Sequence, residues 1–387
     1  MSSQEGLSRR RVANQSTSSA TLTDSSSSHD SRNGTTNASS THAHTQSHSH
    51  AGSAFRGGGG IAYDPRDLDM TEEDGKGGKM PRLTIMEEVL LLGLKDKQGY
   101  LSFWNDNISY ALRGCILIEL ALRRRIALVK DPNRRRLTIS ERLVEVLDDR
   151  ITGETILDEA LKMMKAQEGP DGERMSVGSW IDLMSGETWN LMKISFQLKQ
   201  VRERLLKGLV DKGVLRTEKR NFLLFDMATH PVADVRTKDG IVERVVSLLT
   251  ATTTTIPERA LDKEGTQCRV TRAVCLVCAA YAASVLDNAF GRLTYEDREA
   301  AFSRCDEIMT EFSAWPLGSG SGSGSTTSRR ANRIAVGEGS RGVTGREIVI
   351  GLVQEVKKES ASDSEEDLGF ELIAGVLEVL SKLDSLL

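Results

Sequence analysis

Apolar side chains recur at intervals of three and four residues through most of the chain beyond residue 80, as they do in amphipathic and buried α-helices. This spacing predicts helices over 84–93, 105–124, 155–166, 188–212, 235–250, 266–289 and 294–312. The first of these segments opens with Thr84 and Glu87 at the spacing of a capping box, in which each side chain satisfies an unpaired backbone amide. The chain is therefore expected to be mainly α, with a single globular helical domain.

Two short stretches have the pattern of small β-hairpins at the margin of that domain, with apolar strands on either side of a turn. The predicted strands and turns are 126–129, Asp131-Pro132-Asn133 and 136–139 for the first hairpin, and 214–217, Lys219-Arg220-Asn221 and 222–225 for the second. The last strand, Phe222-Leu223-Leu224-Phe225, is apolar on both faces. From the pattern alone it is expected to be a buried strand.

Low-complexity composition marks the N-terminal region and one internal segment. Residues 1–60 are rich in Ser, Thr, His and Gly, and they cannot bury enough apolar area to offset the entropy lost on ordering. With the charged, Gly-containing stretch that follows, they predict a disordered tail over 1–80. A Gly-Ser repeat from Gly318 to Ser325 predicts a flexible insertion over 316–345.

The C-terminal region returns to an apolar, periodic pattern. An acidic run at 363–367 precedes Phe370–Leu387, which is strongly apolar and predicts a final helix. We expect C-terminal helices within 346–387 to pack on the helical domain formed by 81–315.

Charge and cysteine content narrow the class of protein. The 387-residue chain has a formal net charge of −4 and a hydrophobic share of 39%, whereas dedicated nucleic-acid binders are usually strongly basic. Its five cysteines lack disulfide-scaffold spacing, which favours free thiols in a reducing cytosol. The N-terminus carries no secretory signal, and the longest apolar run, 273–283, is too short to cross a bilayer.

Candidate catalytic motifs are weak. Five of the six histidines lie in the predicted tail, and the sixth, His230, precedes a proline, where a structural turn residue is expected. Cys275 and Cys278 have redox-motif spacing but lie in an apolar helical run, which favours core packing. The Gly-rich stretch 337–342 matches a dinucleotide fingerprint without the strand and helix that such a site needs. The sequence therefore predicts no enzyme, no cofactor and no metal site.

Basic residues offer a different chemistry. Lys199 and Arg202 are three residues apart on a predicted helix and share a face, while Arg113 lies on another helix with Trp104 near its start. They could be ordinary solvated charges. Alternatively they could form a phosphate pocket, because Arg and Lys make charge-assisted hydrogen bonds to phosphate and Trp suits the membrane–water interface.

Several long blocks, in order over roughly residues 80–315, decide between these readings. The blocks are Thr84–Asn105, Ile108–Cys115, Ile118–Arg123, Ser185–Asn190, Val201–Leu205, Asn221–Asp226 and Thr229–Pro231. In these blocks the chain closely resembles the Golgi phosphoprotein 3 family, whose members are cytosolic readers of phosphatidylinositol 4-phosphate on Golgi membranes. The Gly-Ser insertion and the His-rich tail do not belong to the family pattern.

This resemblance implies a location and a set of partners. A peripheral protein of the cytoplasmic Golgi face, with a cytosolic pool, would hold the lipid phosphate through Trp104, Arg113, Lys199 and Arg202. An N-terminal cluster, Arg9-Arg10-Arg11, would bind the COPI coat. Another surface would capture the cytosolic tails of Golgi glycosyltransferases for retrograde transport and Golgi retention. The hairpin residues Phe222, Leu223, Leu224 and Phe225 would enter the bilayer surface or mediate self-association into a homo-oligomer.

Two other classes of function remain as alternatives. Helices followed by a basic hairpin over 126–139 could form a winged-helix nucleic-acid-binding protein, against which the acidic net charge counts. The chain could also be a degenerate enzyme, which the histidine distribution disfavours. The runs Arg123–Arg125 and Arg134–Arg136 could attract an acidic leaflet or acidic partners.

Overall fold

A computed structural model gives the architecture. It describes residues 79–101, 107–169, 172–188, 191–222, 225–320, 344–360 and 367–383. The mainly helical prediction is confirmed. The α-helices are α2 (Ile85–Gly93), α3 (Asn107–Leu122), α4 (Thr155–Gln167), α5 (Val177–Ser185), α6 (Val201–Asp211), α7 (Val235–Leu249), α8 (Arg269–Ala282), α9 (Tyr295–Phe312), α10 (Gly345–Ser360) and α11 (Leu368–Ser381).

Short 3₁₀ helices and two small antiparallel sheets connect the α-helices. The 3₁₀ helices are η1 (Pro132–Arg136), η2 (Ile139–Glu141), η3 (Leu191–Phe196), η4 (Glu258–Ala260) and η5 (Leu286–Phe290). The two-stranded sheets are β1 (Ile126–Leu128) with β2 (Val144–Val146), and β3 (Glu218–Phe222) with β4 (Phe225–Thr229).

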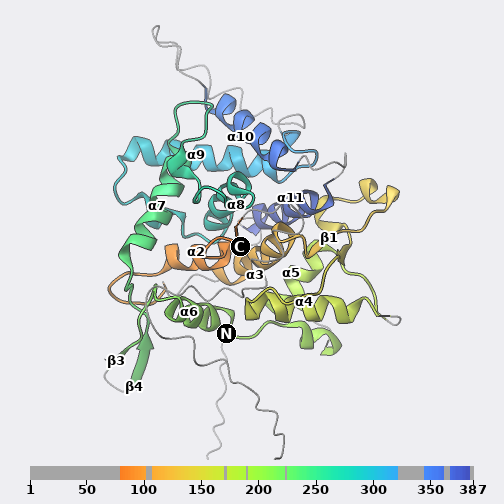
Figure 1. Cartoon of the computed structure of the whole chain (residues 1–387), viewed down its shortest axis with the longest axis horizontal. Helices are drawn as coiled ribbons and strands as arrows, with labels where there is room; N and C mark the ends of the chain where they lie inside the picture. Colours follow the sequence, from red (N-terminus) through yellow and green to blue (C-terminus); the bar gives the residue numbers. More distant parts are fainter. Residues whose placement is uncertain are drawn as a thin grey trace, which may run out of the picture. The chain divides into compact units, whose positions relative to one another are not determined.

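The helices α2, α3, α8 and α11 form the centre of the fold (Figure 1). All nine residues of α2 and most residues of α3, α8 and α11 are buried, so the rest of the fold encloses these helices on all sides. The helix α9 packs on α8 and α10, whereas α6 and the β3–β4 hairpin lie at the lower edge of the view in Figure 1. The predicted capping box is present at the start of α2, where the Thr84 amide donates to Glu87 Oε2 over 2.9 Å.

Close packing of α11 on α3 depends on a glycine. A Cβ atom at Gly114 of α3 would lie 3.1 Å from Leu380 Cδ2 and 3.2 Å from Val376 Cγ1, both on α11. A larger side chain would push the two central helices apart, and protein cores tolerate such overpacking poorly. The apolar C-terminal helix is thus part of the core, even though about thirty residues of low-complexity sequence precede α10 in the chain.

The first predicted hairpin is wrong in its second strand. The strand β1 pairs with β2, with Ile126 opposite Val146, and the segment predicted as a strand over 136–139 forms η1 and η2 instead. The cause is local: Asp131 caps η1 by accepting a hydrogen bond from the Asn133 amide over 2.8 Å, and Pro132 suits the first helical turn. Residues 132–141 therefore form the 3₁₀ helices η1 and η2, and the chain pairs with β1 only afterwards, at β2.

The second hairpin forms, but its turn is displaced. Its register pairs Glu218 with Thr229 and Phe222 with Phe225, so Lys219, Arg220 and Asn221 lie in β3 rather than in the turn. The residues between the paired ends are Leu223 and Leu224, which lie outside the described residues. The apolar run 222–225 therefore does not form one strand, because Phe222 ends β3 and Phe225 begins β4, and the hairpin extends away from the helices (Figure 1).

Candidate functional site

Arg113 of α3 joins three separate segments. Its Nε donates to the carbonyl of Met184 over 3.3 Å, and its Nη2 donates to the carbonyl of Leu198 over 2.8 Å. Its Nη1 donates to both the carbonyl and the hydroxyl of Ser109, each over 2.8 Å. Arg113 therefore holds the end of α5 and the turn before α6 against α3, and only 6% of it is exposed.

The guanidinium of Arg113, which clamps α5 and the turn before α6 to α3, has no carboxylate partner among the described residues. Burial and, after it, the nearby cation Arg202 lower the pKa of Arg113 to about 10, while Glu203 acts in the opposite direction. A buried cation beside a second cation gives a region of positive potential. Such a region favours binding of an anion, and perturbed groups of this kind are enriched at functional sites.

The turn that carries Lys199 is not part of a helix, so the predicted helix over 188–212 is wrong. It is divided into η3 and α6 by a turn in which Gln200 has a positive φ of 54°. The backbone of Leu198 explains the break, because its amide donates to Met184 over 3.1 Å while its carbonyl accepts from Arg113. These tertiary hydrogen bonds occupy the backbone amide and carbonyl of Leu198, which a continuous helix would need for its own hydrogen bonds.

Lys199 and Arg202 lie on either side of the start of α6. Lys199 is exposed and Arg202 is half-buried, and neither forms an ion pair with any residue that the structure describes. The N-cap Gln200 provides no side-chain hydrogen bond to the first amides of α6. Free amides and the helix dipole make such an N-terminus favourable for an anion.

The hydroxyl of Ser185, next to Met184 in the chain, belongs to no recognised sequence motif. Ser185, which follows Met184 at the end of α5, has a shielded Oγ without a hydrogen-bond partner among the described residues. In the sequence it is the first residue of the block Ser185–Asn190, and that position alone indicates no role. An unsatisfied buried hydroxyl is uncommon in folded proteins and is compatible with a missing polar ligand.

Of the four residues predicted to hold the phosphate, the structure brings three to one place. Arg113, Lys199 and Arg202 meet where α3, the turn after η3 and the start of α6 converge. Trp104 lies outside the described residues, as do Arg9, Arg10 and Arg11. Their roles stay predictions.

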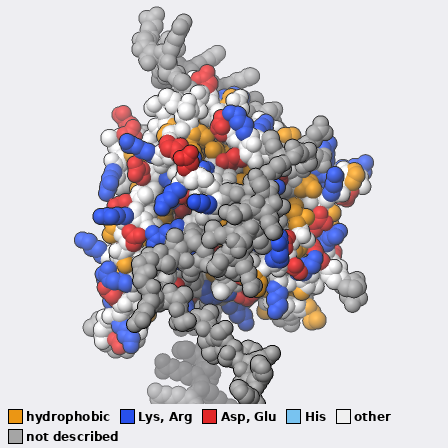
Figure 2. Space-filling model, in the orientation of Figure 1, with side chains coloured by type: hydrophobic (Ala, Val, Ile, Leu, Met, Phe, Trp, Pro, Cys, Tyr) orange, Lys and Arg blue, Asp and Glu red, His pale blue; other side chains and the backbone are white. Residues whose placement is uncertain are grey.

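The other basic runs are partly used in internal ion pairs. Arg123 pairs with Glu119, Arg125 with Asp148, and Arg134 with the buried Glu371 of α11. On the face drawn in Figure 2, basic and acidic side chains are interspersed. The winged-helix alternative loses its basic hairpin, because β1 pairs with β2 and not with residues 136–139.

Potential catalytic groups have ordinary structural roles. Burial raises the pKa of the thiols of Cys275 and Cys278, which both lie inside α8. Burial lowers the pKa of His230, whose backbone amide donates to Gly99 over 2.8 Å. Among the described residues no cluster of three or more His, Cys, Asp or Glu could hold a metal ion.

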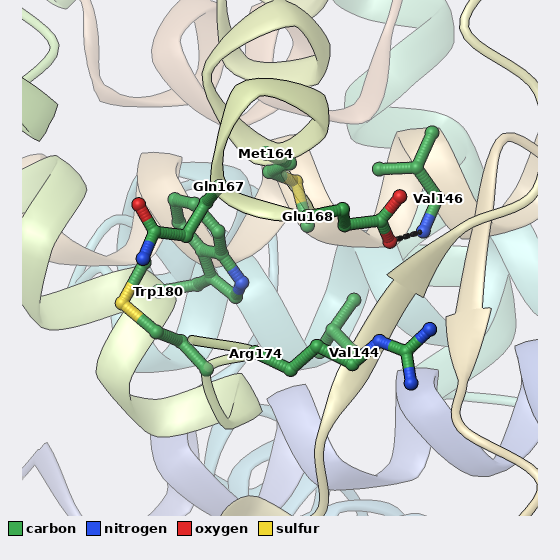
Figure 3. A pocket seen from close by; sticks show the side chains of 8 residues that line it. Val144, Val146, Met164, Gln167, Glu168, Arg174 and Trp180 are labelled. Atoms are coloured by element: carbon green, nitrogen blue, oxygen red, sulfur yellow. Dashed lines mark hydrogen bonds between the residues drawn. The ribbon is translucent and has the colours of Figure 1, made fainter. Parts of the chain in front are cut away.

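A small cavity lies beside α5. Figure 3 shows it between α4, α5 and β2, lined by Met164, Glu168 and Trp180 among others, with a volume of about 10 Å³. In it Glu168 accepts a hydrogen bond from the Val146 amide over 2.6 Å. This space holds no more than one water molecule. Within the part of the chain that the structure describes, no helix is both long and apolar enough to span a bilayer.

Comparisons with known proteins identify a family for this sequence. A family model described as Golgi phosphoprotein 3 (GPP34) matches residues 85–321, which include all of α2 to α9. The chain is 53% identical to the vacuolar protein sorting-associated protein 74 of Schizosaccharomyces pombe over 328 residues, which cover 84% of this chain and 88% of the relative. It is 47% identical to the protein of the same name from Eremothecium gossypii over 327 residues, 84% of this chain and 90% of the relative.

Proposed function

Because this chain belongs to the Golgi phosphoprotein 3 (GPP34) family, we propose that it is a peripheral Golgi adaptor that binds phosphatidylinositol 4-phosphate. It links the cytosolic tails of Golgi glycosyltransferases to the COPI coat and so returns these enzymes in retrograde vesicles. The observation that supports the lipid site is the buried charge of Arg113, which has no ion pair among the described residues and lies beside Arg202. The adaptor makes and breaks no covalent bond.

The site supports recognition of a phosphate monoester. Arg202 and Lys199 supply cations that no described acid neutralises, and the first amides of α6 add the positive end of the helix dipole. Arg113 has used most of its donors on three carbonyls and a hydroxyl, so it contributes mainly charge and the position of the turn. Trp104 would lie beside the same pocket at the membrane interface.

Magnitudes favour a defined pocket over general attraction. Each basic residue near an acidic leaflet contributes about 1 kcal/mol, so three or four such residues alone give roughly millimolar binding. Hydrogen bonds to a charged phosphate contribute on the order of 1.5–3 kcal/mol each and can select the headgroup. Stable attachment needs a second signal. The apolar tip of the β3–β4 hairpin would provide it by entering the bilayer or by self-association.

Substitution of Arg202 with glutamine tests the lipid site. We expect Arg202→Gln to weaken binding to vesicles that contain phosphatidylinositol 4-phosphate at least about tenfold, because one charge-assisted hydrogen bond to the phosphate is lost. Co-sedimentation with vesicles of phosphatidylcholine, with and without that lipid, measures the change. Lys207→Gln is the matched control, since Lys207 is an exposed cation of the same helix without a described ion pair. Equal binding by wild type and Arg202→Gln would show that the pocket is wrongly assigned.

Substitution of the N-terminal arginines tests the coat contact separately. Replacement of Arg9, Arg10 and Arg11 with serine is expected to abolish capture of purified coatomer while lipid binding stays unchanged. Serine substitution of Arg329, Arg330 and Arg333 removes the same charge from another low-complexity region and should leave capture intact. Loss of capture in both variants would indicate general electrostatic attraction in place of a specific coat-binding cluster.

A further inference from the structure

The 3₁₀ helix η3 presents apolar side chains to solvent beside the proposed phosphate site. Met192 is 85% exposed and Ile194 is 41% exposed, whereas long apolar side chains at most other described positions are buried. With three residues per turn, positions 192 and 195 share the outward face of η3, and Ser195 is exposed as well. Solvent exposure of this kind has no stabilising role in the isolated protein.

The position of η3 is set by the same contacts that build the phosphate site. Phe196 at its end packs edge-on against Trp180 of α5, with ring centroids 5.9 Å apart. The Gln197 amide donates to the Ile194 carbonyl over 3.1 Å, and the next residue, Leu198, is held by Arg113. Met192 is therefore attached to the site through a short, anchored segment.

The charged residues around η3 indicate which kind of surface would bind to it. Lys193 of η3 forms no ion pair with any described residue, and the same holds for Lys199 and Arg202 nearby. An exposed methionine and isoleucine among unpaired cations complement an anionic bilayer, which offers both an apolar interior and acidic headgroups. A second copy of the chain would place these like charges against one another, and a soluble acidic peptide would leave the apolar side chains uncovered.

We propose that η3 is a membrane contact in which Met192 and Ile194 enter the headgroup region while Arg113, Lys199 and Arg202 hold the lipid phosphate. The inference rests on the proposed lipid-binding function and adds to it an apolar anchor distinct from the β3–β4 hairpin. The flexible, unbranched methionine side chain adapts to an irregular lipid surface at small cost. Apolar insertion and phosphate recognition at one place together make binding specific to the membrane-embedded lipid over its soluble headgroup.

The test separates membrane contact from headgroup recognition in the full-length chain. The variant Met192→Ser/Ile194→Ser is compared with wild type, with Arg202→Gln and with Tyr295→Ser, which removes a 77% exposed apolar side chain of α9. Vesicle binding is measured by co-sedimentation with phosphatidylcholine vesicles containing phosphatidylinositol 4-phosphate. Headgroup binding is measured by titration calorimetry with inositol 1,4-bisphosphate, the soluble headgroup.

We expect Met192→Ser/Ile194→Ser to bind vesicles about tenfold more weakly, which corresponds to about 1.4 kcal/mol, and to bind the soluble headgroup as wild type does. Arg202→Gln should lose both kinds of binding, and Tyr295→Ser neither. If Met192→Ser/Ile194→Ser bound vesicles as strongly as wild type, the proposed anchor would be wrong and the lipid site would remain supported. If Met192→Ser/Ile194→Ser lost binding to the soluble headgroup, the anchor would also be wrong, because η3 would then act on the pocket and not on the bilayer. Failure of wild type to bind either probe would overturn both proposals.

An environment-sensitive label reports insertion directly. Met192→Cys can be labelled selectively with a nitrobenzoxadiazole dye, because four of the five native cysteines are buried and burial raises the pKa of the fifth, Cys268, to about 11. Blue-shifted emission on addition of vesicles with phosphatidylinositol 4-phosphate is the expected result. Unchanged emission under conditions in which the labelled protein co-sediments would overturn insertion of η3.

Discussion

Replacement of Arg113 with alanine is expected to lower the free energy of unfolding by about 3 kcal/mol or more and to abolish binding to phosphatidylinositol 4-phosphate. The variant would leave the Leu198 carbonyl without the Arg113 donor and the Met184 carbonyl with the Leu198 amide but without Arg113, and an unsatisfied buried polar group costs about 1–3 kcal/mol. It would also release the turn that carries Lys199. Urea denaturation followed by circular dichroism, with vesicle co-sedimentation of the same preparation, measures both effects.

Two further variants separate the structural role of Arg113 from its charge. Arg113→Lys keeps a positive charge but cannot reproduce a planar donor that reaches three segments, so its stability should remain well below that of wild type. Arg202→Gln should lose lipid binding at nearly unchanged stability, because Arg202 is half-buried and bonds no described residue. If Arg113→Ala unfolded at the same urea concentration as wild type, the clamp would have no energetic importance and Arg113 would act only on the ligand.

The second large effect is expected at Glu119, which is fully buried in the centre of the fold. Its carboxylate accepts from Arg272 over 2.9 Å, from Arg123 over 3.4 Å and from the Ile85 amide over 2.8 Å, and thereby joins α2, α3 and α8. Glu119→Ala leaves Arg272 buried without its counter-charge. Removal of one partner of a buried ion pair costs about 3–5 kcal/mol, so we expect a loss of that size in the free energy of unfolding.

A double variant distinguishes loss of charge pairing from loss of packing. Glu119→Leu/Arg272→Met removes both charges and retains apolar volume, and it should recover much of the stability that Glu119→Ala loses. A double variant as unstable as the single one would mean that packing and the Ile85 hydrogen bond, not the stranded charge, dominate. Thermal and urea unfolding of the three proteins at one ionic strength provide the comparison.

The Glu119 network also makes a pH-dependent contribution. Burial alone would raise the pKa of Glu119, but Arg272, Arg123 and the hydrogen bonds lower it from 4.5 to about 2. Because the folded pKa is depressed, the stabilisation is fully present above pH about 4.5 and is lost as the pH falls toward about 2. The shift corresponds to about 3 kcal/mol. The stability difference between wild type and Glu119→Gln should therefore shrink progressively below pH about 4.5.

Much of the helical framework could be predicted from local pattern. The ends of α2, α7 and α9 lie within one residue of the predicted segments, because capping residues and helical periodicity act over a few neighbouring positions. The apolar C-terminal segment predicted a buried helix, which is α11. The helix α5 was not among the predicted segments, although its N-cap Ser176 and the positive φ of 86° at Gly186 are local signals for its ends.

The candidate site was predicted only in part. The resemblance named Arg113, Lys199 and Arg202, and the structure brings these three together, but for a reason that no local pattern contains. Periodicity placed Lys199 and Arg202 on one helix, whereas hydrogen bonds from distant segments hold Leu198 and break the helix before Val201. The structural use of Arg113 and the unsatisfied hydroxyl of Ser185 likewise follow from contacts between α3 and α5.

The helical class, the positions of most helices, the apolar C-terminal helix and membership in the Golgi phosphoprotein 3 family can be read from the chain alone, because side-chain period, capping and long ordered blocks are properties of neighbouring residues. The partner of β1, the position of the β3–β4 turn and the approach of the α3 arginine to α6 come from the folded structure. Each of these depends on whether a backbone group bonds a neighbouring residue or one far away in the chain. The packing of the whole fold determines which of the two bonds forms.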